Sequence, residues 1–274
     1  MAARAVALAV AGAALLAMPS AGVAGVRLEC TAESRSGAAP ALALDVVAVN
    51  AGDEPARDVR PEVVYEHQTY SGEAAALDPG ARREWQIPLA PPGAPGTFAA
   101  TVHVHYVDAL GRGSVPVVAQ VPAPDGSPSP VRLRLAADPV ARVGSATLLI
   151  ENPDARPIAG RVVVVLAGGL ATDPESLPAR VAASGRTTVP LVLENRAALP
   201  PGSYPAYALF EYTASGEHHA AVARADVEVV ADAGGRRARP LLVGASALAA
   251  TLALLAVAWR RARSRSAGDC PAGS

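Results

Sequence analysis

The sequence predicts an all-β protein made of two β-sandwiches in tandem, placed between apolar segments near its two ends. Short runs rich in Val, Thr and Tyr alternate with Pro, Gly, Asn and Asp, which is the pattern of strands separated by turns. Between the apolar segments, long stretches with helical periodicity are missing. The same landmarks also occur twice in the same order, which indicates two copies of one domain.

Residues 1–24 have the composition of a secretory signal peptide. Arg4 supplies the positive charge, an apolar run continues to Met18, and small residues around Ala21 and Ala24 offer cleavage sites. The run is about 14 residues long, which is short for crossing a bilayer, so an uncleaved N-terminal anchor is the less favoured alternative. We therefore expect the following residues to be exported.

The segment Leu241–Trp259 predicts a transmembrane helix, because it contains no charged residue and roughly matches the bilayer core in length. Residues 232–240 form a juxtamembrane linker, and residues 260–274 form a short cytoplasmic tail that begins with a cluster of arginines. The export signal sets this orientation, since arginines flank both sides of the helix. We expect a single-pass protein of the cytoplasmic membrane with its bulk in the periplasm or outside the cell.

The Pro- and Ser-rich residues 123–130 predict a linker that divides the exported part in two. The resulting segments, residues 25–122 and 131–231, are each near the usual size of an immunoglobulin-like domain. The landmarks of the two halves are almost equally spaced. Gly96 and Gly202 are 106 positions apart, and so are Tyr106 and Tyr212. Asn50 and Asn152 are 102 positions apart. This offset indicates duplication of a whole domain.

Alternation along the glycine-led strand of each half assigns its faces. The core faces are expected to carry these residues: Phe98, Ala100, Val102, Val104 and Tyr106 in the first half, and Tyr204, Ala206, Ala208, Phe210 and Tyr212 in the second. Pro88 and Pro190 fall inside apparent strands, so we expect those strands to lie at sheet edges or to end there.

This order of elements resembles the CARDB-type (cell-adhesion-related) sandwich domains and similar immunoglobulin-like modules of bacterial cell-envelope proteins. The shared elements are a strand ending in an Asn turn, a second strand, and a Gly-led strand that ends in Tyr before a hairpin. The resemblance covers residues 26–122 and 131–231. It implies two immunoglobulin-like sandwiches that act as spacers or binding platforms, and it implies no catalytic residues.

The five histidines offer one weak candidate for a metal site. His103 and His105 share the outward face of one strand at about 6 to 7 Å, a spacing that a metal could use, but no third ligand is evident nearby in sequence. Two polar side chains on a solvated sheet face are the favoured interpretation. His218 and His219 follow Gly216, which predicts a solvated hairpin tip.

Tyr65, His67 and Tyr70 form the one polar-aromatic cluster, and we expect any contact surface there first. The favoured alternative is a Tyr-bearing strand with one buried face. Cys30 lies beside the presumed first strand and is expected to be a small core or edge residue.

Composition and motifs point to a protein that binds rather than catalyses. A formal net charge of −1 gives no field that would attract nucleic acid, and an aromatic content of 4% argues against a large carbohydrate-stacking surface. No known catalytic or phosphate-binding motif occurs, and no cofactor is expected. We expect a non-catalytic, membrane-anchored cell-envelope protein whose domains bind or position an envelope protein or glycan. The alternative is an accessory or assembly subunit of an envelope secretion, transport or polysaccharide system.

Overall fold

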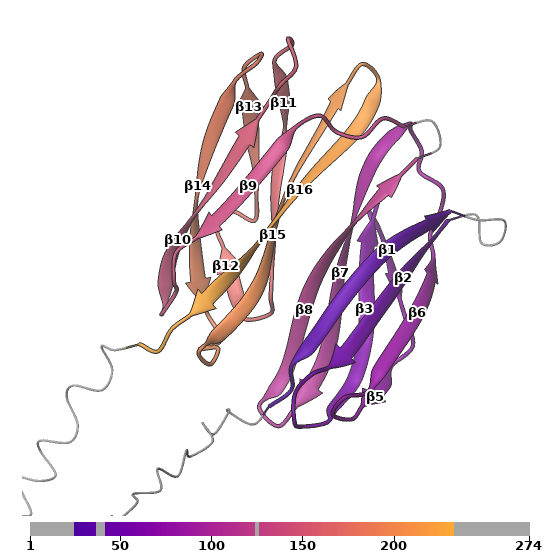
Figure 1. The fold of residues 1–274 in the computed structure, drawn as a ribbon, viewed down its shortest axis with the longest axis vertical. Coiled ribbons are helices and arrows are strands. Elements are labelled where there is room, and N and C mark those ends of the chain that lie inside the picture. Colours follow the sequence, from indigo (N-terminus) through magenta and orange to yellow (C-terminus); the bar gives the residue numbers. More distant parts are fainter. Residues whose placement is uncertain (1–24, 37–41, 124–125, 233–274) are drawn as a thin grey trace, which may run out of the picture.

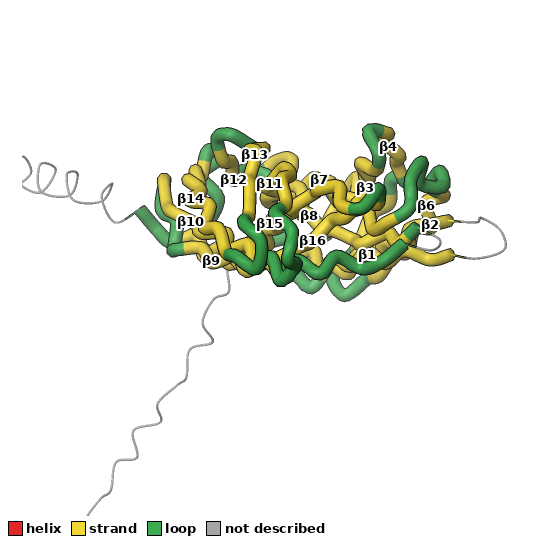
Figure 2. Tube along the Cα trace, turned by 90° about the horizontal axis from the view of Figure 1, so that it is seen from above, coloured by secondary structure: helices red, strands yellow, loops and turns green. Residues whose placement is uncertain are grey.

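The computed structural model describes residues 25–36, 42–123 and 126–232, and every regular element in these ranges is a β-strand. Figure 2 accordingly colours the described residues only as strands and loops. Among these residues there is no helix that could cross a bilayer. The predicted signal peptide, transmembrane segment and tail all lie outside the described residues.

The first sandwich consists of two sheets that face each other (Figure 1). One sheet has the order β1-β2-β6, and in the other β7 pairs with β3 and β8, while β4 and β5 pair with β3. This division of strands matches the immunoglobulin arrangement. The strands are β1 (Leu28–Ser36), β2 (Leu42–Asn50), β3 (Ala56–Tyr65), β4 (Gln68–Ser71), β5 (Ala75–Leu77), β6 (Arg82–Pro88), β7 (Gly96–Asp108) and β8 (Gly111–Pro122).

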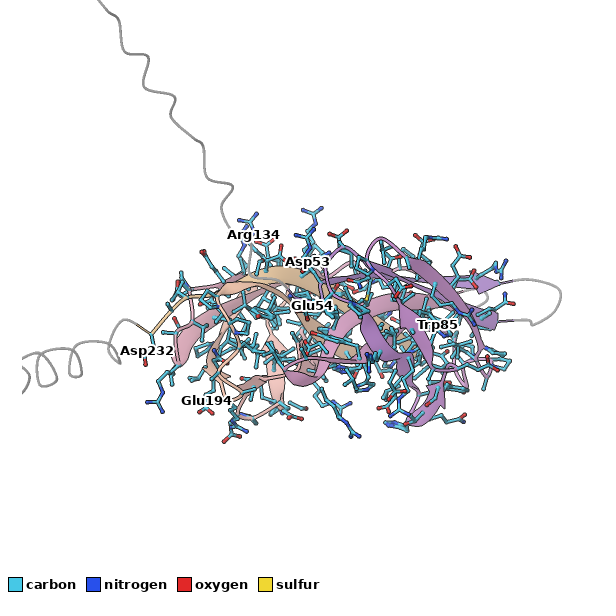
Figure 3. All side chains as sticks on the ribbon, turned by 90° about the horizontal axis from the view of Figure 1, so that it is seen from below. Asp53, Glu54, Trp85, Arg134, Glu194 and Asp232 are labelled. Carbon is cyan, nitrogen blue, oxygen red and sulfur yellow. The ribbon has the colours of Figure 1, made fainter. Side chains whose placement is uncertain are left out.

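The second sandwich repeats this plan. One sheet has the order β12-β14-β10-β9, and the facing sheet has the order β13-β11-β15-β16. Figure 3 shows Arg134 and Glu194 on the outside of this sandwich. The strands are β9 (Arg132–Ala137), β10 (Val143–Glu151), β11 (Ile158–Leu166), β12 (Leu170–Thr172), β13 (Ser176–Val181), β14 (Arg186–Asn195), β15 (Gly202–Ala214) and β16 (Glu217–Val229).

Each sandwich has its own apolar core, built from the faces that alternation predicts. Ala100, Val102 and Val104 of β7 are fully buried in the first core, as are Ala208 and Phe210 of β15 in the second. Trp85 of β6 also points into the first sandwich (Figure 3). The core-face prediction is therefore confirmed, although Tyr106 at the end of β7 and Tyr204 near the start of β15 are only partly buried.

Both prolines inside strands lie where no neighbour needs their missing N–H group. Pro88 is the last residue of β6, which is the edge strand of its sheet. Pro190 of β14 pairs with Thr147 of β10, and its other side is open because β12 pairs only with residues 193–195. Pro88 confirms the predicted strand end, and Pro190 lies where β14 has no neighbour on one side.

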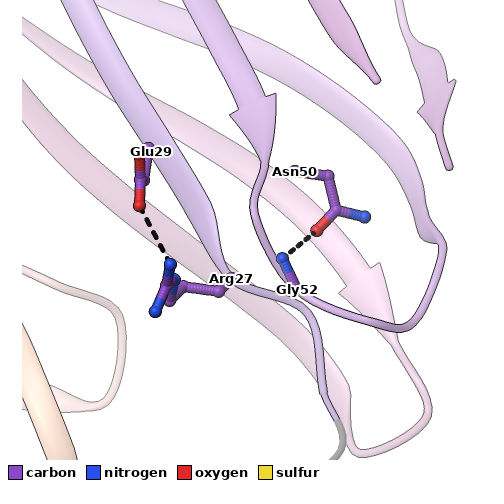
Figure 4. Close-up of polar contacts among 4 residues, drawn as sticks. All are labelled: Arg27, Glu29, Asn50 and Gly52. Carbon is purple, nitrogen blue, oxygen red and sulfur yellow. Dashed lines mark hydrogen bonds and ion pairs between the residues drawn. The ribbon is translucent and has the colours of Figure 1, made fainter. Parts of the chain in front are cut away.

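A buried asparagine closes the same turn in both sandwiches. Asn50 donates through Nδ2 to the carbonyls of Glu54 (2.7 Å) and Leu77 (3.0 Å), and its Oδ1 accepts the Gly52 N–H (3.0 Å; Figure 4). Because the side chain is fully buried, these bonds satisfy backbone groups that water cannot reach.

Asn152 repeats this arrangement in the second sandwich. Its Nδ2 donates to the carbonyls of Arg156 (2.8 Å) and Ala182 (3.0 Å), and its Oδ1 accepts the Asp154 N–H (3.0 Å). It is 2% exposed. The shared hydrogen-bond pattern supports the duplication that the sequence predicts.

Replacing either buried asparagine by Ala should destabilise the protein. Asn50→Ala or Asn152→Ala leaves two carbonyls and one N–H without partners, at a cost of about 2–3 kcal/mol in the free energy of unfolding. Urea unfolding followed by circular dichroism measures this change. Asn195→Ala is the comparison variant: Asn195 also donates to two carbonyls (3.3 and 3.4 Å) and accepts one N–H (Leu199, 2.8 Å), but its side chain is partly exposed, so a smaller loss is expected. Equal unfolding midpoints for all three variants would contradict the assignment.

Candidate functional site

The two sandwiches are joined by a short parallel pairing between β16 and β7. His218 pairs with Gly96 and His219 with Thr97, and the His218 N–H also donates to the Pro95 carbonyl at 2.9 Å. This pairing makes one continuous sheet across both sandwiches. We call these four paired residues the seam.

The two seam histidines insert on opposite sides of β16. The His218 ring stacks on Phe98 of the first sandwich at 4.4 Å, and Phe98 in turn meets the edge of Tyr65 at 6.2 Å. The His219 ring stacks on Tyr212 of the second sandwich at 5.0 Å. The predicted solvated tip is wrong for these residues, because His219 is only 6% exposed and the turn ends before them.

Apolar contact continues from the seam between the outer faces of the two sheets. Val165, Tyr207 and Leu209 of the second sandwich are buried there against Ala99 and Val118 of the first. Polar contacts follow the same line: Gln120 Nε2 donates to the Ala220 carbonyl (3.1 Å), and the Gly168 N–H donates to the Ser114 carbonyl (3.0 Å). The sandwiches therefore pack as one body.

A cavity of about 310 Å³ lies beside the seam, under the segment that connects the sandwiches. We call it the linker pocket. Its lining combines linker residues with the ends of second-sandwich strands and turns: Ser127, Pro128, Pro130, Asn152, Asp154, Ile158, Tyr212, Ala214, Ser215, Glu217 and His219.

Hydrogen bonds hold the linker over this pocket. The Ser127 N–H donates to Glu217 Oε2 at 3.2 Å, and Thr97 Oγ1 donates to the Ser127 carbonyl at 3.2 Å. Ser129 Oγ and the Tyr212 hydroxyl form a hydrogen bond of 3.0 Å. Segments that are separate in sequence thus form one wall.

The pocket can accept hydrogen bonds from a ligand. Asp154 and Glu217 each use one carboxylate oxygen to accept a backbone N–H. The second oxygen of each accepts no hydrogen bond from the described residues. The Tyr212 and His219 rings in the lining are buried and stack on each other, and His219 Nδ1 has no hydrogen-bond partner among the described residues. Carboxylate oxygens at a pocket wall suit a ligand rich in hydroxyl or N–H donors.

The structure keeps His103 and His105 together on the outer face of β7. Their ring centroids are 6.1 Å apart, and His105 Nε2 lies 3.9 Å from Glu62 Oε2. Burial lowers the pKa of His103, as does neighbouring His105, while Glu62 opposes the shift. Within the described ranges, no group of three or more His, Cys, Asp or Glu side chains is placed to hold a metal ion.

The predicted contact cluster is split between core and surface. Tyr65 is 1% exposed and lies in the first core, so it cannot contribute to a contact surface. The Tyr70 hydroxyl donates to Gln68 Oε1 (2.8 Å) and accepts the Ala90 N–H (3.2 Å), which gives it a structural role. His67 is exposed in the turn between β3 and β4.

Cys30 is a half-buried free thiol on β1, packed against the first core. Burial raises the pKa of the Cys30 thiol to about 12. The thiol therefore stays protonated at neutral pH and is a poor nucleophile. Its predicted place at the core or edge is confirmed, since β1 is an edge strand.

No family model matches the sequence, and no curated protein matches it. Solved structures with partial likeness include a red sea bream transglutaminase, which is 12% identical over 76% of this chain and 31% of its own, with a TM-score of 0.30. The E. coli chaperone DraB is 14% identical over 73% of this chain and 98% of its own, with a TM-score of 0.32. E. coli alpha-2-macroglobulin is 16% identical over 75% of this chain and 17% of its own, with a TM-score of 0.30.

These low TM-scores leave the strand order as the basis for assigning the fold. By that order the described part of the chain is all-β and forms two immunoglobulin-like β-sandwiches.

Gly96→Ala should separate the sandwiches, because a Cβ at Gly96 would lie 1.9 Å from the His218 carbonyl oxygen. We expect a loss of roughly 4 kcal/mol or more in the free energy of unfolding and a larger radius of gyration in X-ray scattering. Gly111→Ala is the matched control. It has the same φ of +131° with nothing within 4 Å of its Cβ, so it carries only backbone strain of about 1–3 kcal/mol. An unchanged radius of gyration for Gly96→Ala would contradict the role of the seam.

Stability should fall as the solution becomes acidic, in part through His218. Burial lowers the pKa of His218 below its ordinary value of 6.5, as does neighbouring His219, while Glu211 and Glu66 oppose the shift. A depressed folded pKa means that the unfolded chain binds protons first, so stability is full above pH 6.5 and declines as pH falls toward the folded pKa.

His218→Phe keeps the aromatic stack on Phe98 and removes the titrating group. We expect this variant to lose part of the decline in urea midpoint between pH 7 and 5. His67→Gln, at an exposed turn, should keep the full decline. Identical pH profiles for His218→Phe and the parent chain would show that His218 does not contribute.

Proposed function

We propose that this chain is a non-catalytic, membrane-anchored cell-envelope protein whose exported body binds or positions another envelope component. The observation that carries the proposal is the seam, which makes the two sandwiches one body with a defined pocket at their junction. A rigid body with a shaped surface suits binding and spacing. We also propose that the sandwiches are CARDB-type modules, which the repeated Asn turns support.

The direction of β16 supports an outward-facing pocket. The strand begins beside the linker pocket at Glu217 and runs for 13 residues to Val229, which is about 40 Å at 3.3 Å per residue. The chain then continues from Asp232 toward the predicted anchor. An anchor attached at this end places the linker pocket at the far end of the body.

The lining of the pocket favours a donor-rich partner. Carboxylates of Asp154 and Glu217 beside the ring of Tyr212 can accept hydrogen bonds from sugar hydroxyls or peptide N–H groups. The partner we propose is therefore an envelope glycan or the exposed segment of an envelope protein.

In-cell photocrosslinking at the pocket rim tests the proposal. A photoreactive residue at Ser215, which is exposed on the rim, should form a discrete crosslinked adduct with an envelope component in living cells. The matched control places the same residue at Thr188, which is exposed on β14 of the opposite sheet and away from the pocket lining. Equal adducts at both positions, or none at Ser215, would contradict a binding role for the pocket.

The anchor is tested in the same cells by protease treatment of intact spheroplasts. We expect protease to remove the β-sandwich body and to leave a membrane-embedded C-terminal fragment detected by a tag after Ser274. Full protection of the chain would overturn the topology. Recovery of the whole chain in the soluble fraction would overturn the anchor.

A further inference from the structure

The turn between β7 and β8 presents a single large apolar side chain to solvent. Leu110 is 84% exposed, more than any other large hydrophobic side chain in the described ranges. The turn is well formed, because Asp108 Oδ1 accepts the N–H groups of Leu110 (2.8 Å) and Gly111 (2.9 Å). Its backbone donors are thus satisfied within the turn, which lowers the cost of moving it out of water.

The equivalent turn of the second sandwich lacks this feature. The turn between β15 and β16 carries Ser215 and Gly216 at its tip, and it borders the linker pocket. Since the two hairpins are copies, the exposed Leu is not a requirement of the fold. A function specific to the first hairpin accounts for it better.

Leu110 lies at the end of the body from which the described chain leaves. β7 and β16 run parallel, so the Leu110 turn and the end of β16 lie at the same end of the body (Figure 1). Two more exposed apolar side chains lie there, Val143 at 63% and Val230 at 37%. They are close to each other, because the Val230 N–H donates to the Val140 carbonyl, three residues before Val143.

Arginines flank the Leu110 turn. Arg112 and Arg57 are exposed and both pair in register with Val107, so they border the turn from either side of β7. Neither forms any of the ion pairs found among the described residues. Guanidinium groups beside an apolar tip match the chemistry of a bilayer surface, where phosphates lie above the acyl chains.

The length of chain that follows the body sets its distance from the predicted anchor. Eight residues, 233–240, separate Asp232 from Leu241, and a fully extended chain of eight residues spans at most about 28 Å. The end of the body that carries Val230 is therefore held close to the bilayer if the anchor is correct. This step rests on the proposed function.

We propose that the Leu110 turn is a membrane-contact site, in which Leu110 inserts into the lipid interface while Arg112 and Arg57 bind lipid phosphates. The body then touches the bilayer at two points, the anchor and the Leu110 turn. This second point fixes the tilt of the body, and it directs the linker pocket away from the membrane.

Depth-dependent quenching in the full-length chain tests the proposal. The chain is reconstituted into phosphatidylcholine–phosphatidylglycerol vesicles after Cys30→Ala and Cys270→Ser, with an environment-sensitive dye on Ala109→Cys and native Leu110 retained. Lipids spin-labelled near the headgroup should quench this dye at least twofold more than a dye on Ser215→Cys in the equivalent turn. Adding Leu110→Asp to the Ala109→Cys chain should abolish the difference, and Val64→Asp, an exposed apolar position on β3, should preserve it.

Alkaline extraction of the same vesicles tests the membrane anchor separately from the membrane-contact site. A chain that resists extraction but shows no quenching at position 109 overturns the membrane-contact site and leaves the anchor intact. Equal quenching at positions 109 and 215 also overturns it, since the body then lies flat on the bilayer. A chain released by alkali overturns the anchor, and the membrane-contact site fails with it.

Discussion

The parallel pairing of two residues of β16 with two residues of β7 determines how the two sandwiches are arranged. It requires glycine at position 96, because any Cβ there would overlap the His218 backbone. It also sets His218 against the first core and His219 against the second. Backbone pairing and aromatic stacking therefore together fix how the two sandwiches lie against each other, and each of these interactions depends on the other. Without the backbone pairing, the His218 ring would have no fixed position over Phe98.

Much of the fold could be predicted because it follows from local pattern. Alternation along β7 and β15 identified their core faces, and the strand prolines identified sheet edges. The repeated Asn was visible as a turn residue, but its burial was not, since the carbonyl of Leu77 that it binds lies 27 positions away. Side-chain hydrogen bonds of that range leave no periodic signal in sequence.

The candidate site could not be predicted for the same reason. His218 follows Gly216 and so has the sequence context of an exposed tip, while its partner Gly96 belongs to the other repeat. Pairing across repeats depends on the angle at which two finished sandwiches meet, which no single strand encodes. Tyr65 was predicted at a possible surface because it belongs to a polar-aromatic cluster in sequence, yet its ring is buried in the first core against Phe98. The linker pocket combines linker residues with strand ends and turns that are distant in sequence, so no single segment reveals it.

Because the two sandwiches are joined, the direction of a binding site relative to the membrane is more restrained than in two hinged domains. In a hinged pair, the direction of a binding site relative to the membrane is averaged over the linker motions, which lowers the effective concentration at a fixed partner. Here the seam, the apolar contact around Leu209 and the hydrogen bond from Gln120 restrain that hinge. Under the proposed membrane contact at Leu110, the orientation set there is carried along β7 and β16 to the linker pocket. The physical coupling between the two ends is the shared sheet, so it depends on Gly96 as much as on either site.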